Sequence, residues 1–204
     1  MSAEVSAADV KALRERTGAG MMVCKAALSE AGGDVDAAVE ILRVKGQASA
    51  AKRSGKATSE GAICSYIHAT GTVGVLLEVQ SETDFVARGD EFRTFAYEVA
   101  LHIAAAAPLY VSADEIPQEL RDAERSVFEQ KAEEDGKPAE VVAKIVDGQL
   151  EKWTNEVALL GQVHVNADKH DGKTIEELRA GLASRVGENL QIARFARFVV
   201  GEET

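Results

Sequence analysis

At residues 81–88 the chain reads SETDFVAR, and this stretch lies between two segments of predicted regular structure. The apolar run Val73–Val79 before it predicts a buried strand. Apolar residues spaced by three and four from Glu91 to Ala107 predict a helix that packs on a sheet. The chain must turn sharply between the two, where Gly, Asn, Asp and Ser are the usual residues. Phe85 and Val86 stand there instead, so Phe85 either packs back into the core or contacts a partner.

The strand before this corner is predicted to be the second strand of a β-hairpin. Residues 63–67 (ICSYI) favour a strand, and the turn residues 69–72 separate them from Val73–Val79. The segment Leu190–Val200 has apolar residues on both faces and predicts a third strand that completes the sheet. Groups of helices with a small antiparallel sheet give an α+β fold class.

The amino-terminal part of the chain predicts three short helices between Ser6 and Lys45. Ser6 is a good N-cap, Gly18 permits the turn after the first helix, and Gly46 is expected to end the third. Three helices of this size share a small core and are marginally stable alone. The segment is therefore interpreted as a docking module similar in size to small protein-binding domains, and not as a catalytic domain.

Composition divides the chain into three parts. Residues 1–46 form the three-helix docking module, residues 47–60 a basic flexible linker, and residues 61–204 the α+β core. The linker is small and polar and has no sustained apolar period. Its basic residues either are solvated in a tether, which is the preferred interpretation, or contact an acidic surface. These residues are Lys52, Arg53 and Lys56.

The second half of the core predicts a helical hairpin. Gln118–Asp135 and Glu140–Leu160 both have helical patterns, and the break between them is Gly136-Lys137-Pro138. Thr174 is followed three residues later by Glu177, the spacing of a capping box, which predicts the start of one more helix.

The overall composition is that of a soluble globular protein, with 46% apolar and 28% charged residues in 204. A net charge of −11 argues against a general nucleic-acid binder and favours a basic surface on a protein partner. Cys24 and Cys64 are far apart, which argues against a disulfide framework or a cysteine zinc site. No signal peptide or membrane-spanning run is visible, so a cytoplasmic protein is expected.

No set of residues predicts catalysis. The chain lacks the G-x-x-x-x-G-K-[ST], G-x-S-x-G and H-E-x-x-H motifs, and its four histidines are scattered. His102 falls beside the apolar stripe of its helix, where a single histidine is more often structural than a ligand or base. We therefore expect no enzyme activity, no cofactor and no metal site.

Two stretches carry a family resemblance. Residues 13–22 (LRERTGAGMM) with 24–28 (CKAAL) resemble the amino-terminal signature of bacterial translation elongation factor Ts, and residues 83–88 (TDFVAR) after Glu78-Val79 resemble its second signature. The resemblance continues through 101–104 (LHIA), 136–138 (GKP) and 194–195 (RF) to the end of the chain. Val23 and Gln80 depart from the family pattern, which has an acid and an Asn there.

The resemblance implies a fold and partners. The first module would be similar to a ubiquitin-associated three-helix fold, and the core would be the short form with one core subdomain. The short form is expected to pair as a homodimer and to form a 2:2 complex with elongation factor Tu. The dimer contact would involve Leu190–Val200; the alternative, of equal weight, is that this strand is sandwiched inside one monomer.

The resemblance also implies a function without covalent chemistry, guanine nucleotide exchange on elongation factor Tu, which holds GDP with Mg²⁺. Four residues of the corner would dislodge the partner's Mg²⁺: Thr83, Asp84, Phe85 and Val86. Further partner contacts would come from Arg14, Met21, Met22, Arg88 and His102. For Met21 the alternative is a core position, and for Arg14 a solvated charge. A second functional hypothesis is an adaptor that binds another protein through residues 1–46 and accelerates no nucleotide release.

Overall fold

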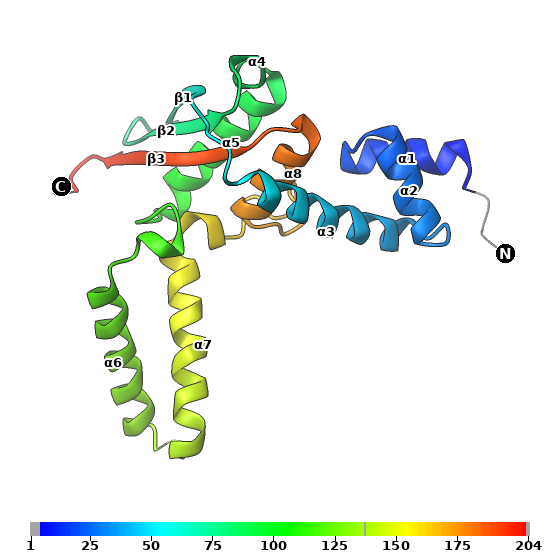
Figure 1. Cartoon of the computed structure of the whole chain (residues 1–204). Coiled ribbons are helices and arrows are strands. Elements are labelled where there is room, and N and C mark those ends of the chain that lie inside the picture. Colours follow the sequence, from blue (N-terminus) through cyan, green and yellow to red (C-terminus); the bar gives the residue numbers. More distant parts are fainter. Residues whose placement is uncertain (1–4, 137, 203–204) are drawn as a thin grey trace. The chain divides into compact units, whose positions relative to one another are not determined.

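The computed structural model describes residues 5–136 and 138–202 (Figure 1). Lys137, in the predicted break between two helices, lies outside these residues, as do the first four residues of the expected docking module. Within the described residues the chain forms eight α-helices and a three-stranded antiparallel sheet, which confirms the α+β class. None of these helices is long and apolar enough to span a membrane.

The chain divides into two compact units. The first unit contains the residues up to Ala62 together with Gln80–Phe95 and Glu177–Gln191. The second unit contains Ile63–Val79, Ala96–Glu176 and the residues from Ile192 onward. Each unit is described below by itself.

The first unit begins with the three predicted helices, α1 (Ala7–Thr17), α2 (Met21–Glu30) and α3 (Val35–Arg53). The Ser6 and Asp34 side chains cap α1 and α3, accepting hydrogen bonds from the backbone N–H groups of Asp9 and Ala37 at 3.1 and 3.0 Å. Gly18 follows α1 with φ of 69°, the left-handed conformation that glycine adopts without strain. The three helices share a core of small and medium apolar side chains: Val10, Leu13, Cys24, Ala27, Leu28 and Ala38.

Helix α3 corrects one expectation. It continues past Gly46 to Arg53, so the first half of the expected flexible linker is helical. Gly46 does not adopt the left-handed conformation that ends many helices. The residues after it, 47–53 (QASAAKR), are mostly strong helix formers, so the helix continues through them. The boundaries of the three predicted parts stay predictions.

The sheet consists of β1 (Glu60–Ile67), β2 (Val73–Ser81) and β3 (Leu190–Val199), in the order β1-β2-β3. Helix α5 spans Asp90–Ala106, and its part from Ala96 onward, in the second unit, packs against one face of this sheet. The Arg197 guanidinium donates to the Ala104 carbonyl at 3.3 Å, and the rings of Tyr66 and Tyr97 contact edge to face. In β2 the alternate residues that face α5 are buried: Val75, Leu77 and Val79.

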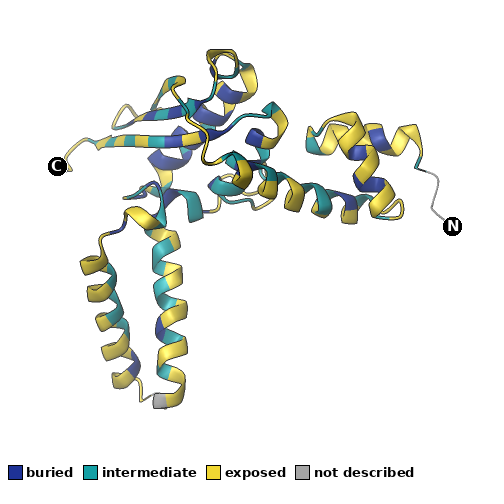
Figure 2. Ribbon diagram, in the orientation of Figure 1, coloured by how far each residue is buried: buried dark blue, intermediate teal, exposed yellow. Residues whose placement is uncertain are grey.

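The opposite face of the sheet is open (Figure 2). It exposes four large apolar side chains of the second unit: Ile63, Ile67, Leu76 and Phe198. β3 is an edge strand whose burial alternates after Ile192, with Phe198 exposed. The alternative that this strand is sandwiched inside one monomer is therefore wrong.

The second unit also contains the predicted helical hairpin, α6 (Gln118–Glu134) and α7 (Ala139–Val157), which lie side by side in Figure 1. An ion pair of 3.0 Å joins Arg125 to Asp147 across it. Short 3₁₀ turns, Ala113–Glu115 and Leu159–Gly161, precede and follow the hairpin. The irregular segment predicted at 163–172 leads to α8 (Ile175–Val186).

Truncation of Leu13 tests the core of the first three helices. Leu13 is fully buried, and Leu→Ala at a buried site costs about 2–5 kcal/mol. We expect the hydrogen-exchange protection of the α2 amides in Leu13→Ala to fall by about 30-fold or more, since 1.4 kcal/mol corresponds to about tenfold. Val44→Ala, at an exposed position of α3, is the control and should change protection by less than about threefold. Equal effects in the two variants would contradict this assignment of the core.

Candidate functional site

The corner predicted from SETDFVAR forms a single helical turn, α4 (Asp84–Ala87). Ala87 is buried, whereas the Phe85 side chain is 87% exposed. The chain therefore does not bury Phe85 in its own core. Of the two possibilities that the sequence left open, the structure agrees with the one in which Phe85 is accessible to a partner.

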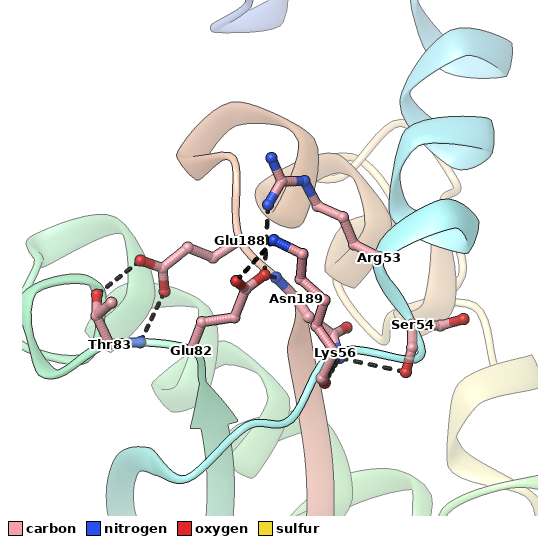
Figure 3. Close-up of polar contacts among 7 residues, drawn as sticks. All are labelled: Arg53, Ser54, Lys56, Glu82, Thr83, Glu188 and Asn189. Carbon is pink, nitrogen blue, oxygen red and sulfur yellow. Dashed lines mark hydrogen bonds and ion pairs between the residues drawn. The ribbon is translucent and has the colours of Figure 1, made fainter.

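Glu188, from the segment Glu177–Gln191 of the first unit, holds the corner (Figure 3). Its carboxylate accepts two hydrogen bonds from Thr83, one from the backbone N–H at 3.0 Å and one from the side-chain hydroxyl at 2.6 Å. The hydroxyl of the buried Ser81 donates to the Thr83 carbonyl oxygen at 2.9 Å. Both backbone polar groups of Thr83 are thus bonded to side chains, which fixes the residue that immediately precedes α4.

A second set of contacts holds the neighbouring residue Glu82 (Figure 3). The backbone N–H of Asn189 donates to the Glu82 carboxylate at 2.6 Å, and Lys56 and Arg53 approach it at 3.3 and 3.4 Å. The Asn189 bond is the largest influence on the Glu82 carboxyl group; together with the two cations it outweighs burial and lowers the pKa below its usual value. Glu82 is therefore ionised at neutral pH.

Two basic residues of the expected linker thus contact an acidic side chain of the same unit. Asn189 adds to this contact, because its side-chain amide donates to the carbonyl oxygens of Lys56 and Ser54 at 2.9 and 3.4 Å. The interpretation of Arg53 and Lys56 as residues of a solvated tether is wrong. The alternative, contact with an acidic group, holds for both.

The other sequence-predicted residues of the first unit are also exposed. Met22 is 74% exposed and Met21 is more than half exposed, so the alternative core position for Met21 is wrong. Met21 is the first residue of α2, and the core begins at Cys24 one turn later. Arg14 is exposed on α1. Arg88 forms an exposed ion pair of 3.0 Å with Asp84, four residues before it.

His102 belongs to the second unit and is buried. Its Nδ1 accepts the Val165 backbone N–H at 3.1 Å, so its Nε2 carries the proton and donates to the Gln162 side-chain oxygen at 2.8 Å. Burial lowers the pKa of His102. The ring lines an open hollow of about 760 Å³ beside α7. His102 therefore has a structural position, as its place beside the apolar stripe predicts.

Sequence reasoning missed Glu188 and Asn189. Glu188 is 105 residues from Thr83 along the chain and follows Gly187, which has a left-handed φ of 74°. Nothing in the local pattern of a glutamate in a turn indicates its partner. Sequence reasoning also missed a group of potential metal ligands in the second unit, Glu98, His164 and His170.

Comparison with known proteins identifies relatives over nearly the whole chain. The family model described as elongation factor TS matches residues 35–171. The elongation factor Ts of Solidesulfovibrio magneticus is 51% identical over 199 residues, which cover 98% of this chain and 98% of the relative. The proteins of the same name from Citrifermentans bemidjiense and Caldanaerobacter subterraneus subsp. tengcongensis are each 48% identical over 198 residues, covering 97% of this chain and 90% and 98% of the relatives.

Replacement of Glu188 by Gln tests whether its carboxylate fixes the corner. A Gln amide is neutral, so both bonds to Thr83 lose the negative charge of their acceptor, and a hydrogen bond to a charged group contributes about 1.5–3 kcal/mol. We expect hydrogen exchange of the Thr83 amide to accelerate about tenfold or more. Glu60→Gln, at an exposed glutamate of the same unit, is the matched control and should leave this rate unchanged. Unaltered exchange in Glu188→Gln would show that the corner is held in another way.

Proposed function

The chain belongs to the elongation factor Ts family of translation elongation factors, and we propose that it is the guanine nucleotide exchange factor for elongation factor Tu. In this proposal it binds elongation factor Tu·GDP in the cytoplasm, displaces Mg²⁺ and promotes release of GDP so that GTP can bind. The observation that carries the proposal is the exposed Phe85 on a helical turn whose preceding residue is held by Glu188 and Ser81.

An exchange factor needs no covalent chemistry. It must bind the nucleotide-free partner more tightly than the GDP-bound partner, and by linkage it then weakens GDP binding by the same factor. Phe85 would enter an apolar crevice between helices of the partner and disturb the region that holds Mg²⁺. Thr83, Asp84 and Val86 would complete this contact.

Burial of one Phe side chain supplies about 1.5–3 kcal/mol, which corresponds to a factor of about ten to one hundred. A broader interface must supply the rest. Met21 and Met22 present exposed, adaptable apolar side chains at the start of α2. Arg14 and Arg88 add exposed positive charge. His102 is buried, so in this proposal it acts by holding Gln162 and Val165 in place and not by direct contact.

We propose further that two copies of the chain pair through the open face of the sheet. This face exposes Ile63, Ile67, Leu76 and Phe198 within the second unit. A group of large apolar side chains on one surface is typical of a protein interface. Pairing of identical faces gives a closed twofold dimer, and each copy would bind one elongation factor Tu in a 2:2 complex.

Phe85→Ala tests the exchange function. Phe85 makes little contact with its own chain, so the variant should fold normally. We expect the rate at which it stimulates GDP release to fall about tenfold to a hundredfold, the equivalent of the lost Phe burial. Stopped-flow release of a fluorescent GDP from elongation factor Tu measures this rate.

Leu109→Ala, at an exposed apolar residue of the second unit, is the control for this assay and should leave the rate unchanged. An unchanged rate with folded Phe85→Ala would overturn the role of Phe85. If the unaltered chain binds elongation factor Tu but never accelerates release, the chain is an adaptor and not an exchange factor.

Phe198→Asp tests the dimer. The introduced charge would lie on the open face, where burial in an interface without a partner is costly. Sedimentation equilibrium should show the unaltered chain at twice 21.7 kDa and Phe198→Asp at 21.7 kDa. Leu109→Asp supplies the same charge on a side chain outside the sheet and should stay dimeric. A monomeric unaltered chain, or a dimeric Phe198→Asp, would contradict the proposed interface.

A further inference from the structure

A cluster of two histidines and one glutamate lies in the second unit, and no step of nucleotide exchange uses it. Glu98 projects from α5, and His164 and His170 come from the irregular segment between the Leu159–Gly161 turn and α8. The three ligand atoms that these side chains offer all lie within 4.8 Å of one another. From this geometry we infer that Glu98, His164 and His170 form a binding site for a divalent transition-metal ion of the Zn²⁺ class.

Two donor-to-donor distances in the cluster are close to the edges of a coordination tetrahedron. The Glu98 Oε2 atom is 3.4 Å from His170 Nε2 and 3.8 Å from His164 Nε2. Zinc binds imidazole nitrogen and carboxylate oxygen at about 2.0–2.2 Å, which gives ligand-to-ligand edges of about 3.3–3.6 Å in a tetrahedron. The His170–Glu98 contact is a long hydrogen bond, and the His164–Glu98 separation is too long for one. Contraction of a few tenths of an ångström would bring Glu98 Oε2 and the two Nε2 atoms to tetrahedral separations, and the two histidine donors, which lie within 4.8 Å of each other, would close around the same ion.

The donor set and its exposure also suit a metal ion. Imidazole and carboxylate are ligands that Zn²⁺ accepts, and three protein ligands leave the fourth position to water. The His164 side chain is fully buried, whereas those of Glu98 and His170 keep 15% and 16% exposure. The rings of His164 and His170 contact edge to face with centroids 4.1 Å apart. An ion therefore has access past Glu98 and His170.

Lys169 orients the carboxylate. Its ammonium group donates to Glu98 Oε1 at 2.5 Å, so Oε2 is the oxygen nearest the two histidines. Burial alone would raise the pKa of Glu98, but the hydrogen bonds from Lys169 and His170 outweigh it and lower the pKa below its usual value. Glu98 is an ionised ligand at neutral pH. The positive charge of Lys169 weakens the attraction for a cation, which limits the affinity of the site.

His164 must change its tautomer to bind the ion. Its Nδ1 accepts the Asn166 backbone N–H at 3.1 Å, and its Nε2 donates to the Glu98 carbonyl oxygen at 3.1 Å. Coordination through Nε2 moves the ring proton to Nδ1, turns Nε2 away from the Glu98 carbonyl oxygen and breaks both bonds, without net release of a proton. Because Nδ1 accepts a hydrogen bond, the ring carries a single proton, on Nε2, and is neutral. The Asn166 amide therefore reports directly on occupancy.

The site would link α5 to the segment 163–172, in which the backbone N–H groups of His170 and Gly172 donate to Ala167 in turns. Ligand binding to the folded state alone raises its stability by mass action. The ion would thus stabilise the second unit. This role is independent of nucleotide exchange, and it can be tested without elongation factor Tu.

The experiment titrates the chelator-treated full chain with Zn²⁺ alone, followed by calorimetry, and with Co²⁺, followed by its visible absorption. We expect one ion per chain, a Co²⁺ spectrum typical of four-coordinate geometry, and a shift of the Asn166 amide resonance on Zn²⁺ addition. His170→Ala and Glu98→Gln should each weaken binding about tenfold or more, because second-shell changes alone cost about 10–100-fold.

His68→Ala removes an exposed histidine elsewhere in the second unit and is the matched control. It should bind within about twofold of the unaltered chain, since it leaves the three ligands intact. Circular dichroism of the metal-free variants checks that they are folded. No binding by the unaltered chain, binding retained in both His170→Ala and Glu98→Gln, or binding lost in His68→Ala would each overturn the proposal.

Discussion

The two hydrogen bonds from Thr83 to the Glu188 carboxylate hold the backbone in place immediately before the exposed corner of this protein. They join residues 105 positions apart and act together with the neighbouring bond from Asn189 to Glu82. Consecutive residues of one segment are thus bound to consecutive residues of the other. Arg53 and Lys56 compensate the charge of Glu82, so this arrangement does not leave an unpaired acid beside the corner.

The energetic consequence follows from comparing the entropy cost of ordering the corner with the free energy gained by burying Phe85. Ordering the backbone costs about 1–2 kcal/mol per residue, or about 4–8 kcal/mol for a mobile segment from Thr83 to Val86. Burial of Phe85 in a partner returns about 1.5–3 kcal/mol. A mobile corner would therefore lose more on binding than its aromatic side chain gains. In the proposed complex, ordering this segment during folding, through Glu188 and Ser81, would remove that cost from the binding step.

Local chemistry made much of the fold predictable. Ser6 occupies its predicted N-cap position, the β-hairpin and the helical hairpin form as predicted, and the third strand completes the sheet. The errors arose where a local rule competes with another effect. Gly46 lies inside a helix because its neighbours favour helix formation. Met21 has the periodicity of the core stripe, but the helix begins at this residue and the packed region begins one turn later.

The candidate sites were only partly predictable, for a different reason. The unusual apolar corner could be identified from residues 81–88 alone, whereas Glu188 becomes visible only when the chain is folded. The same holds for Glu98, which lies 66 and 72 residues from His164 and His170. No short motif contains these three ligands.

An exposed apolar residue is not in itself a functional signal, because much of any protein surface is apolar. Phe85, Met22 and Phe198 are all exposed, and exposure does not distinguish their roles. The polar contacts near Phe85 distinguish it: Glu188 and Ser81 fix the backbone immediately before its helical turn. A surface that must change its partner's conformation has to resist deformation itself, since otherwise the binding energy deforms the weaker of the two surfaces. Under the proposed exchange function, this requirement accounts for the position of the most exposed of these three side chains next to a closely held backbone.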